Sequence, residues 1–150
     1  MTGGTFTTTI HAPQATVWGL VADLDTHPSW SPHGYTVEWL SGEPNQVGSR
    51  YRSVGWIPGD KKHTNEGEIT GRVEPSRFAL KADDDGYFIN EFDLKPGDDG
   101  TTEVSFTLTF PEMKGFKAVA VSVAFPLFGK PDIRKRMDLL KQRAEGAATS

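Results

Sequence analysis

Three side chains of this sequence could move a proton at a small-molecule site: His63, Tyr35 and Tyr51. His63 and Asn65 lie two residues apart in a strand-like pattern, so both are expected on one face, and Asn90 shares that orientation two strands away. A few polar groups that converge within apolar walls are typical of small-molecule sites. The alternative is that these side chains satisfy one another, a backbone group or a buried water.

Other kinds of catalytic and metal site have less support. The chain has no cysteine, which excludes a thiol nucleophile, disulfides and cysteine-ligated zinc or iron–sulfur sites. It has no Gly-x-Ser-x-Gly phrase and no serine obviously paired with a histidine. His27 and His33 could form a metal pair, but no third ligand is evident. We therefore expect no metal and no cofactor.

Arg50 and Arg52 flank Tyr51, so the two arginines share one face of a strand and Tyr51 lies on the other. If Tyr51 points inward, the arginines are surface charges. If the register is shifted by one residue, an arginine enters the interior, where it would bind a carboxylate or enolate oxygen. The sequence leaves both arrangements open.

Size and composition limit the class of protein. The 150 residues fit one domain, residues 1–150, with residues 1–4 and 146–150 expected to be frayed. The formal net charge of −4 argues against a general nucleic-acid binder, which needs a basic surface. The start of the chain lacks the blocks of a signal peptide, and no apolar run is long enough to span a membrane. We expect a soluble, cytoplasmic monomer or homodimer without stable membrane insertion.

The hydrophobic pattern indicates which elements position the polar residues. It predicts a strand, a short helix, a tight connection or a single extra turn in the phrase HPSWSPHG, six more strands joined by tight turns, and a C-terminal helix. The predicted strands cover residues 6–10, 35–39, 49–57, 63–75, 77–82, 87–94 and 101–110. The predicted helices cover residues 13–24, 116–128 and the segment that begins at Pro131.

The inward face of the predicted sheet carries both large and small side chains. Large rings on its last two strands could fill the space beneath the C-terminal helix; they are Phe88, Phe92, Phe106 and Phe110. Gly67 and Gly71 remove side-chain bulk from the same face, which favours an internal void. The alternative is that both glycines mark bulges where the sheet bends.

Three phrases of the sequence, APQATVWGLVADLDTHPSWSP, VEWLSGEPNQVGSRYR and RMDLLKQRAEG, resemble the START-like helix-grip (SRPBCC) superfamily, in its polyketide cyclase/dehydrase and lipid-transport branch. The resemblance implies an α+β fold. In that fold a curved seven-stranded antiparallel sheet wraps around a long C-terminal helix, and two short helices join the first two strands. It also implies a deep, mostly apolar cavity. Trp30, between two prolines, resembles the family's ring at the cavity mouth; the alternative is that it plugs the base of the helix pair.

The function that this resemblance implies is binding or transport of an apolar small molecule, such as a lipid, a fatty acyl chain or a polyketide-like aromatic, in the cavity. Residues expected to contact this hydrophobic ligand are Trp30, Tyr35, Tyr51, His63, Asn65, Phe88, Asn90, Phe106, Phe116 and Val123. The apolar stretch 116–128 could act as a gate or as a fixed core helix.

Two alternatives to a carrier remain. One is a polyketide cyclase, aromatase or dehydrase, in which His63, Tyr35 or Tyr51 moves a proton. Aromatase/cyclase relatives carry an inward Trp, Ser and Arg on a strand that corresponds to residues 63–73, whereas this chain places Gly67, Ile69 and Gly71 there, which weakens the enzyme hypothesis. The other is a regulatory or cochaperone-like protein without a ligand.

Overall fold

The computed structural model describes residues 2–32, 34–57, 60–83, 87–110 and 130–149. Seven strands form one antiparallel sheet in the order β1-β7-β6-β5-β4-β3-β2. The strands are β1 (Thr2–Ile10), β2 (Tyr35–Ser41), β3 (Arg50–Ile57), β4 (Asp60–Val73), β5 (Arg77–Asp83), β6 (Tyr87–Pro96) and β7 (Thr102–Phe110). The helices are α1 (Gln14–Val21), the 3₁₀ helices η1 (Leu24–Trp30) and η2 (Asp98–Gly100), and α3 (Lys130–Thr149).

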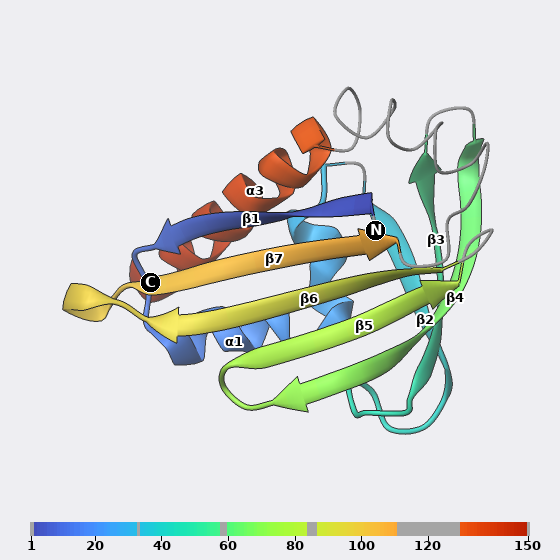
Figure 1. Ribbon diagram of the computed structural model, residues 1–150, viewed down its shortest axis with the longest axis horizontal. Coiled ribbons are helices and arrows are strands. Elements are labelled where there is room, and N and C mark those ends of the chain that lie inside the picture. The colour runs from blue at the N-terminus through green and yellow to red at the C-terminus, as the bar shows by residue number, and fades with distance from the viewer. Residues whose placement is uncertain (1, 33, 58–59, 84–86, 111–129, 150) are drawn as a thin grey trace.

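The sheet curves, and α1, η1 and α3 lie on one side of it. In Figure 1, β2 and β3 stand nearly upright at one end, while β1, β7 and β6 run across the view in front of α1 and α3. This arrangement confirms the predicted helix-grip fold, with two short helices between β1 and β2 and a long helix at the C-terminal end. The helix predicted over residues 13–24 is shorter than expected, since α1 ends at Val21, and the possible extra turn in HPSWSPHG is present as η1, which begins at Leu24.

The helix α3 packs against the sheet through one apolar stripe. Ile133, Met137, Leu140 and Ala144 are all buried, at the spacing of three and four residues that keeps side chains on one face of a helix. Their spacing in the sequence predicted this stripe. The remaining helical segment that the sequence indicated, residues 116–128, lies outside the described residues.

A bulge in β4 overturns part of the predicted pattern. The pairing of β4 with β5 shifts between Ile69 and Gly71, so one extra residue enters the strand and the alternation of faces reverses beyond it. Ile69 is fully buried as predicted. Arg72, predicted outside, pairs with the buried Phe78, and Val73, predicted inside, is 57% exposed.

Arg72 is anchored on the interior side of the sheet. Its Nη1 donates hydrogen bonds to the carbonyl oxygens of Ala22 (3.1 Å) and Asn45 (3.4 Å). Its guanidinium carbon lies 5.4 Å from the ring centroid of Trp18. The inward positions along this part of β4 are therefore Gly67, Ile69 and Arg72, and not Gly71.

Only one of the two predicted inward glycines faces the interior, and its space is filled from the neighbouring strand. Gly67 lies opposite Tyr51 in the β3–β4 pairing, and a Cβ atom placed on Gly67 would collide with the Tyr51 phenol ring and with the carbonyl oxygen of Lys81. A Cβ on Gly71 would instead meet Ala79. Neither glycine therefore leaves a void, because Tyr51 fills the space beside Gly67, and the bulge hypothesis is correct for Gly71 alone.

The open question about the arginines of β3 is resolved by the same pairing. Tyr51 is only 4% exposed and points inward. Arg50 lies on the outer face, 3.6 Å from Glu68. Arg52 forms ion pairs there with Glu66 and Glu38, at 3.2 and 3.7 Å. Neither arginine of β3 enters the interior.

Candidate functional site

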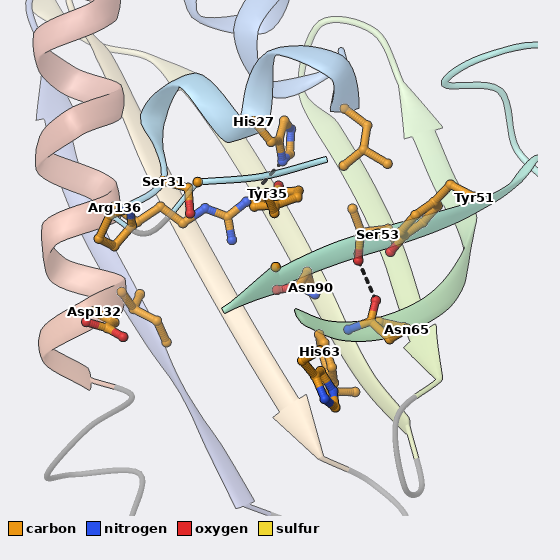
Figure 2. A pocket seen from close by; sticks show the side chains of 18 of the residues that line it. His27, Ser31, Tyr35, Tyr51, Ser53, His63, Asn65, Asn90, Asp132 and Arg136 are labelled. Atoms are coloured by element: carbon orange, nitrogen blue, oxygen red, sulfur yellow. Dashed lines mark hydrogen bonds between the residues drawn. The ribbon is translucent and has the colours of Figure 1, made fainter. Parts of the chain in front are cut away.

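A cavity of about 280 Å³ lies between the concave side of the sheet, η1 and the first turns of α3. Figure 2 shows its walls from close by. Its apolar wall comes mainly from β5 and β6 and includes Leu80, Ala82, Phe88 and Phe92. Most of the lining surface is apolar, as the resemblance implied, although about half of the lining side chains carry a polar group.

One cluster of polar side chains in the cavity comes from the strands of the sheet. Ser53 on β3 faces Asn65 on β4, and its Oγ donates a hydrogen bond of 2.6 Å to Asn65 Oδ1. The half-buried His63 lies two residues before Asn65 on the same strand. The buried Asn90 of β6 lines the cavity, and within the described part of the chain its side-chain amide has no hydrogen-bond partner. A buried amide that bonds to none of the described side chains is suited to hydrogen bonding with water or a ligand.

A second cluster of polar side chains links η1 to α3. Arg136 Nη2 donates a hydrogen bond of 3.0 Å to His27 Nδ1, and His27 Nε2 donates one of 2.8 Å to the carbonyl oxygen of Val21. A guanidinium can only donate and a carbonyl can only accept, so these two contacts fix the neutral tautomer of His27. The imidazole is fully buried.

The environment of His27 keeps it uncharged. Burial, with a smaller contribution from the positive charge of Arg136, lowers the pKa of His27 from 6.5 to about 3, and the hydrogen bond to Val21 opposes this shift. Tyr35 also lines the cavity, and burial raises the pKa of its phenol although the charge of Arg136 opposes this. At neutral pH His27 is therefore an acceptor for Arg136, and Tyr35 keeps its proton.

Arg136 lies over a cluster of aromatic rings. Its guanidinium carbon is 4.8 Å from the ring centroid of Trp30, 5.8 Å from that of Phe92 and 5.7 Å from that of Phe106. These distances are within the range of cation–π attraction. Phe92 in turn packs against Trp30 and Phe106, with ring centroids 5.9 and 4.7 Å apart. The rings hold the guanidinium in place, and Phe92 is at the same time part of the cavity wall.

The structure brings six of the ten predicted ligand contacts to the cavity wall. They are Tyr35, Tyr51, His63, Asn65, Phe88 and Asn90. Trp30 and Phe106, at 0% and 2% exposure, lie behind the wall. Trp30 differs from its expected place at the cavity mouth because η1 turns its ring inward onto His27 and Phe92. Phe116 and Val123 lie outside the described residues, as does the proposed gate.

Sequence reasoning missed Arg136 and Ser53, and it considered His27 only as a metal ligand. Arg136 could have been found from its spacing, since it follows Ile133 by three residues and precedes Leu140 by four, next to the buried stripe of α3. His27 carried no comparable signal, because its role depends on a contact 109 residues away in the chain.

The described residues contain no cluster of three or more histidine, cysteine, aspartate or glutamate side chains arranged to hold a metal ion. No helix among them is long and apolar enough to cross a membrane.

Solved structures share this fold at low sequence identity. Protein CV1439 from Chromobacterium violaceum is 18% identical with a TM-score of 0.74, over 97% of this chain and 99% of its own. A Thermobifida fusca protein is 19% identical with a TM-score of 0.75, over 96% and 93%. The di-domain ARO/CYC StfQ from the steffimycin biosynthetic pathway is 20% identical with a TM-score of 0.70, over 95% of this chain and 44% of StfQ.

Sequence comparison identifies the family. No curated protein sequence matches the chain significantly. A family model described as polyketide cyclase/dehydrase and lipid transport matches residues 1–145, which is nearly the whole chain and agrees with the curved sheet, the long C-terminal helix and the cavity between them. The protein belongs to the polyketide cyclase/dehydrase and lipid transport family.

Proposed function

We propose that this protein binds a small, largely apolar molecule, such as a lipid, a fatty acyl chain or a polyketide-like aromatic, in the cavity beneath α3. The observation that carries the proposal is a cavity of about 280 Å³ with an apolar wall and a buried amide, that of Asn90, without a partner among the described residues. Small-molecule sites combine these two features, since the apolar wall supplies affinity and the polar groups orient the ligand.

The volume of the cavity limits the size of the ligand. A dry apolar cavity of about 150 Å³ accepts one benzene molecule. A volume of about 280 Å³ therefore suits a ligand of about two fused rings or an acyl chain of medium length. Longer ligands would have to extend out of the cavity.

The proposal can be tested by filling the cavity with a side chain. Ala82 is buried and lines the cavity, so Ala82→Phe should place a ring in the space that the ligand needs and abolish binding. The readouts are displacement of a neutral fluorophore, N-phenyl-1-naphthylamine, and native mass spectrometry of the gently purified protein.

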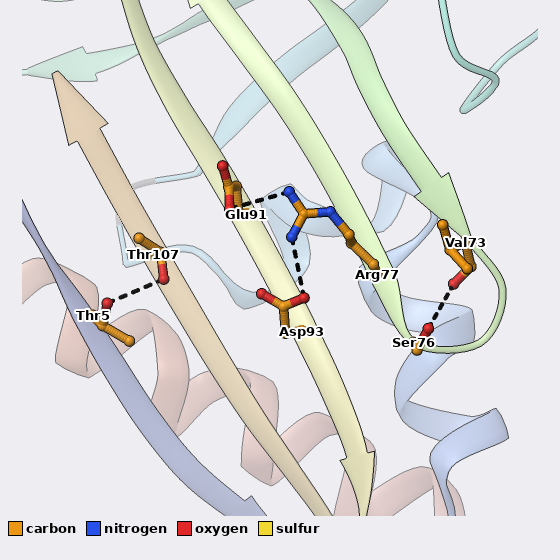
Figure 3. Close-up of polar contacts among 7 residues, drawn as sticks. All are labelled: Thr5, Val73, Ser76, Arg77, Glu91, Asp93 and Thr107. Carbon is orange, nitrogen blue, oxygen red and sulfur yellow. Dashed lines mark hydrogen bonds and ion pairs between the residues drawn. The ribbon is translucent and has the colours of Figure 1, made fainter. Parts of the chain in front are cut away.

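A matched control places the same ring on the other side of the sheet. Thr107 lies on the outer face, where its hydroxyl bonds to that of Thr5 at 3.1 Å, near the ion pairs of Arg77 with Glu91 and Asp93 (Figure 3). Thr107→Phe should bind the fluorophore as the unaltered protein does. Equal binding by Ala82→Phe and Thr107→Phe, with both variants folded, would contradict the proposal.

Catalysis by a cyclase-type enzyme is the second candidate function. The observation that favours it is the presence of Tyr35, which keeps its proton at neutral pH, beside Arg136 in the same cavity. Such a pair could protonate an enolate oxygen as it forms. If so, Tyr35→Phe should retain fluorophore binding and lose turnover of a poly-β-ketone substrate. His63→Ala tests the alternative that His63, on β4, transfers the proton.

A further inference from the structure

Arg136 has hydrogen-bond donors that the protein does not use. Its Nη2 bonds to His27. Its Nε is buried and has no hydrogen-bond partner, and Nη1 makes no hydrogen bond to any described residue. An arginine side chain carries five N–H donors in a rigid planar fork and stays charged at every ordinary pH. The guanidinium therefore has donors left for a further acceptor.

The positive charge of Arg136 is also not neutralised. Its hydrogen-bond acceptor is a neutral imidazole, because the proton of His27 is on the nitrogen that faces Val21. No ion pair joins Arg136 to a carboxylate among the residues that the structure describes. Asp132, one turn earlier on α3, also lines the cavity, but in Figure 2 it stays beside the helix while the guanidinium reaches across toward Tyr35.

The surroundings hold the guanidinium in a fixed orientation. His27 binds one nitrogen, and Trp30, Phe92 and Phe106 lie against the group within 6 Å. Arg136 is half-buried as a residue, and its Nε is fully buried. A guanidinium held in one orientation is well suited to bidentate recognition of a planar oxyanion.

We propose that Arg136 is the anion-binding residue of the cavity, and that the ligand carries a carboxylate next to its apolar body. This inference rests on the proposed function and narrows it. The carboxylate would contact the unused donors of Arg136, and the apolar body would lie against Leu80, Ala82 and Phe88 of β5 and β6. From the sequence alone, an arginine of β3, Arg50 or Arg52, was a possible carboxylate partner. In this proposal that role belongs to Arg136 of α3.

The first test uses the unaltered protein and two matched pairs of ligands. Decanoate is compared with 1-decanol, and naphthalene-2-carboxylate with 2-naphthalenemethanol, by displacement of the neutral fluorophore N-phenyl-1-naphthylamine. Hydrogen bonds to a charged group correspond to roughly a 10- to 100-fold gain in affinity. At least one acid should therefore bind about tenfold or more tightly than its alcohol.

The second test removes the guanidinium. Arg136→Met keeps an apolar stem over the rings and should weaken binding of the acid by about 10- to 100-fold, while affinity for the alcohol changes less than about twofold. Arg136→Lys keeps the charge but loses the planar fork, so its affinity for the acid should be intermediate. Lys135→Met is the control, because this neighbouring lysine is exposed on α3 and should leave all four affinities unchanged.

The outcomes separate the inference from the proposed function. If the fluorophore and all four ligands fail to bind the unaltered protein, the proposed function fails. If the ligands bind but each acid and its alcohol have equal affinity, the inference alone is overturned. It is also overturned if Arg136→Met weakens acid and alcohol equally. Should Arg136→Met fail to fold, the comparison of acid with alcohol on the unaltered protein decides the matter.

Discussion

The buried His27 should make the protein markedly less stable in mild acid. The pKa of His27 is lowered from 6.5 to about 3 in the folded chain, mainly because burial removes the charged form from water. Between these two values the unfolded chain binds a proton at residue 27 and the folded chain does not. Protons therefore favour unfolding, and the stability that His27 provides is lost as the pH falls from 6.5 toward 3.

The loss of stability depends on how far the pH lies below 6.5, the pKa of His27 in the unfolded chain. Each pH unit below it corresponds to about 1.4 kcal/mol, so at about pH 4.5 the loss is on the order of 3 kcal/mol. The lowered pKa of His27 already includes the positive charge of Arg136, which is in hydrogen-bond contact with it. Domains are typically stable by only about 5–15 kcal/mol, so the loss should be easy to measure.

The assay is urea denaturation at about pH 7.5 and about pH 4.5, for the unaltered protein and for His27→Gln. Glutamine can still donate to the carbonyl of Val21 but does not titrate. The unaltered protein should lose about 3 kcal/mol more than His27→Gln between the two conditions. His11→Gln is the control, because His11 is exposed. Equal losses in the unaltered protein and His27→Gln would refute the argument that His27 is buried in its neutral form.

Two further predictions concern stability and use the free energy of unfolding as the readout. Gly67→Ala should destabilise the protein by about 1–3 kcal/mol through its clashes with Tyr51 and with the carbonyl oxygen of Lys81. Tyr51→Leu relieves the first clash only, so the double variant should cost less than the sum of the two single costs; a fully additive pair would contradict this. Arg72→Met should cost about 1–3 kcal/mol because two backbone carbonyls lose their donor, whereas the exposed Arg134→Met should change stability by less than about 0.5 kcal/mol.

Local sequence patterns were sufficient for most of the architecture. The alternation along β1, β6 and β7 and the spacing of Ile133 to Ala144 on α3 depend on neighbours in the chain, and the tight turns between strands require antiparallel pairing. The position of Tyr51 was undecided because its strand alternates equally well in either register. The two registers are distinguished only by the pairing of Tyr51 with Gly67, because a residue larger than glycine at position 67 would collide with the Tyr51 ring.

The candidate site was harder to predict where it depends on tertiary contacts. The wall residues Asn65 and Asn90 follow from strand alternation, so the sequence identified them. The contact between His27 and Arg136 joins η1 to α3, and no local pattern specifies which histidine meets which arginine. Trp30 was expected at the cavity mouth from resemblance, but the turn of η1 that buries its ring depends on packing against Phe92.

The extra residue in β4 also affects how this chain should be aligned with its relatives. Up to Ile69 a residue-by-residue alignment with an unbulged strand matches interior positions with interior ones, but from Gly71 onward it matches each interior position with an exterior one. At 18–20% identity, sequence scoring alone would not reveal such an offset. Residues carried over from a relative to this end of the strand should be transferred by superposition, with a one-residue gap at Thr70.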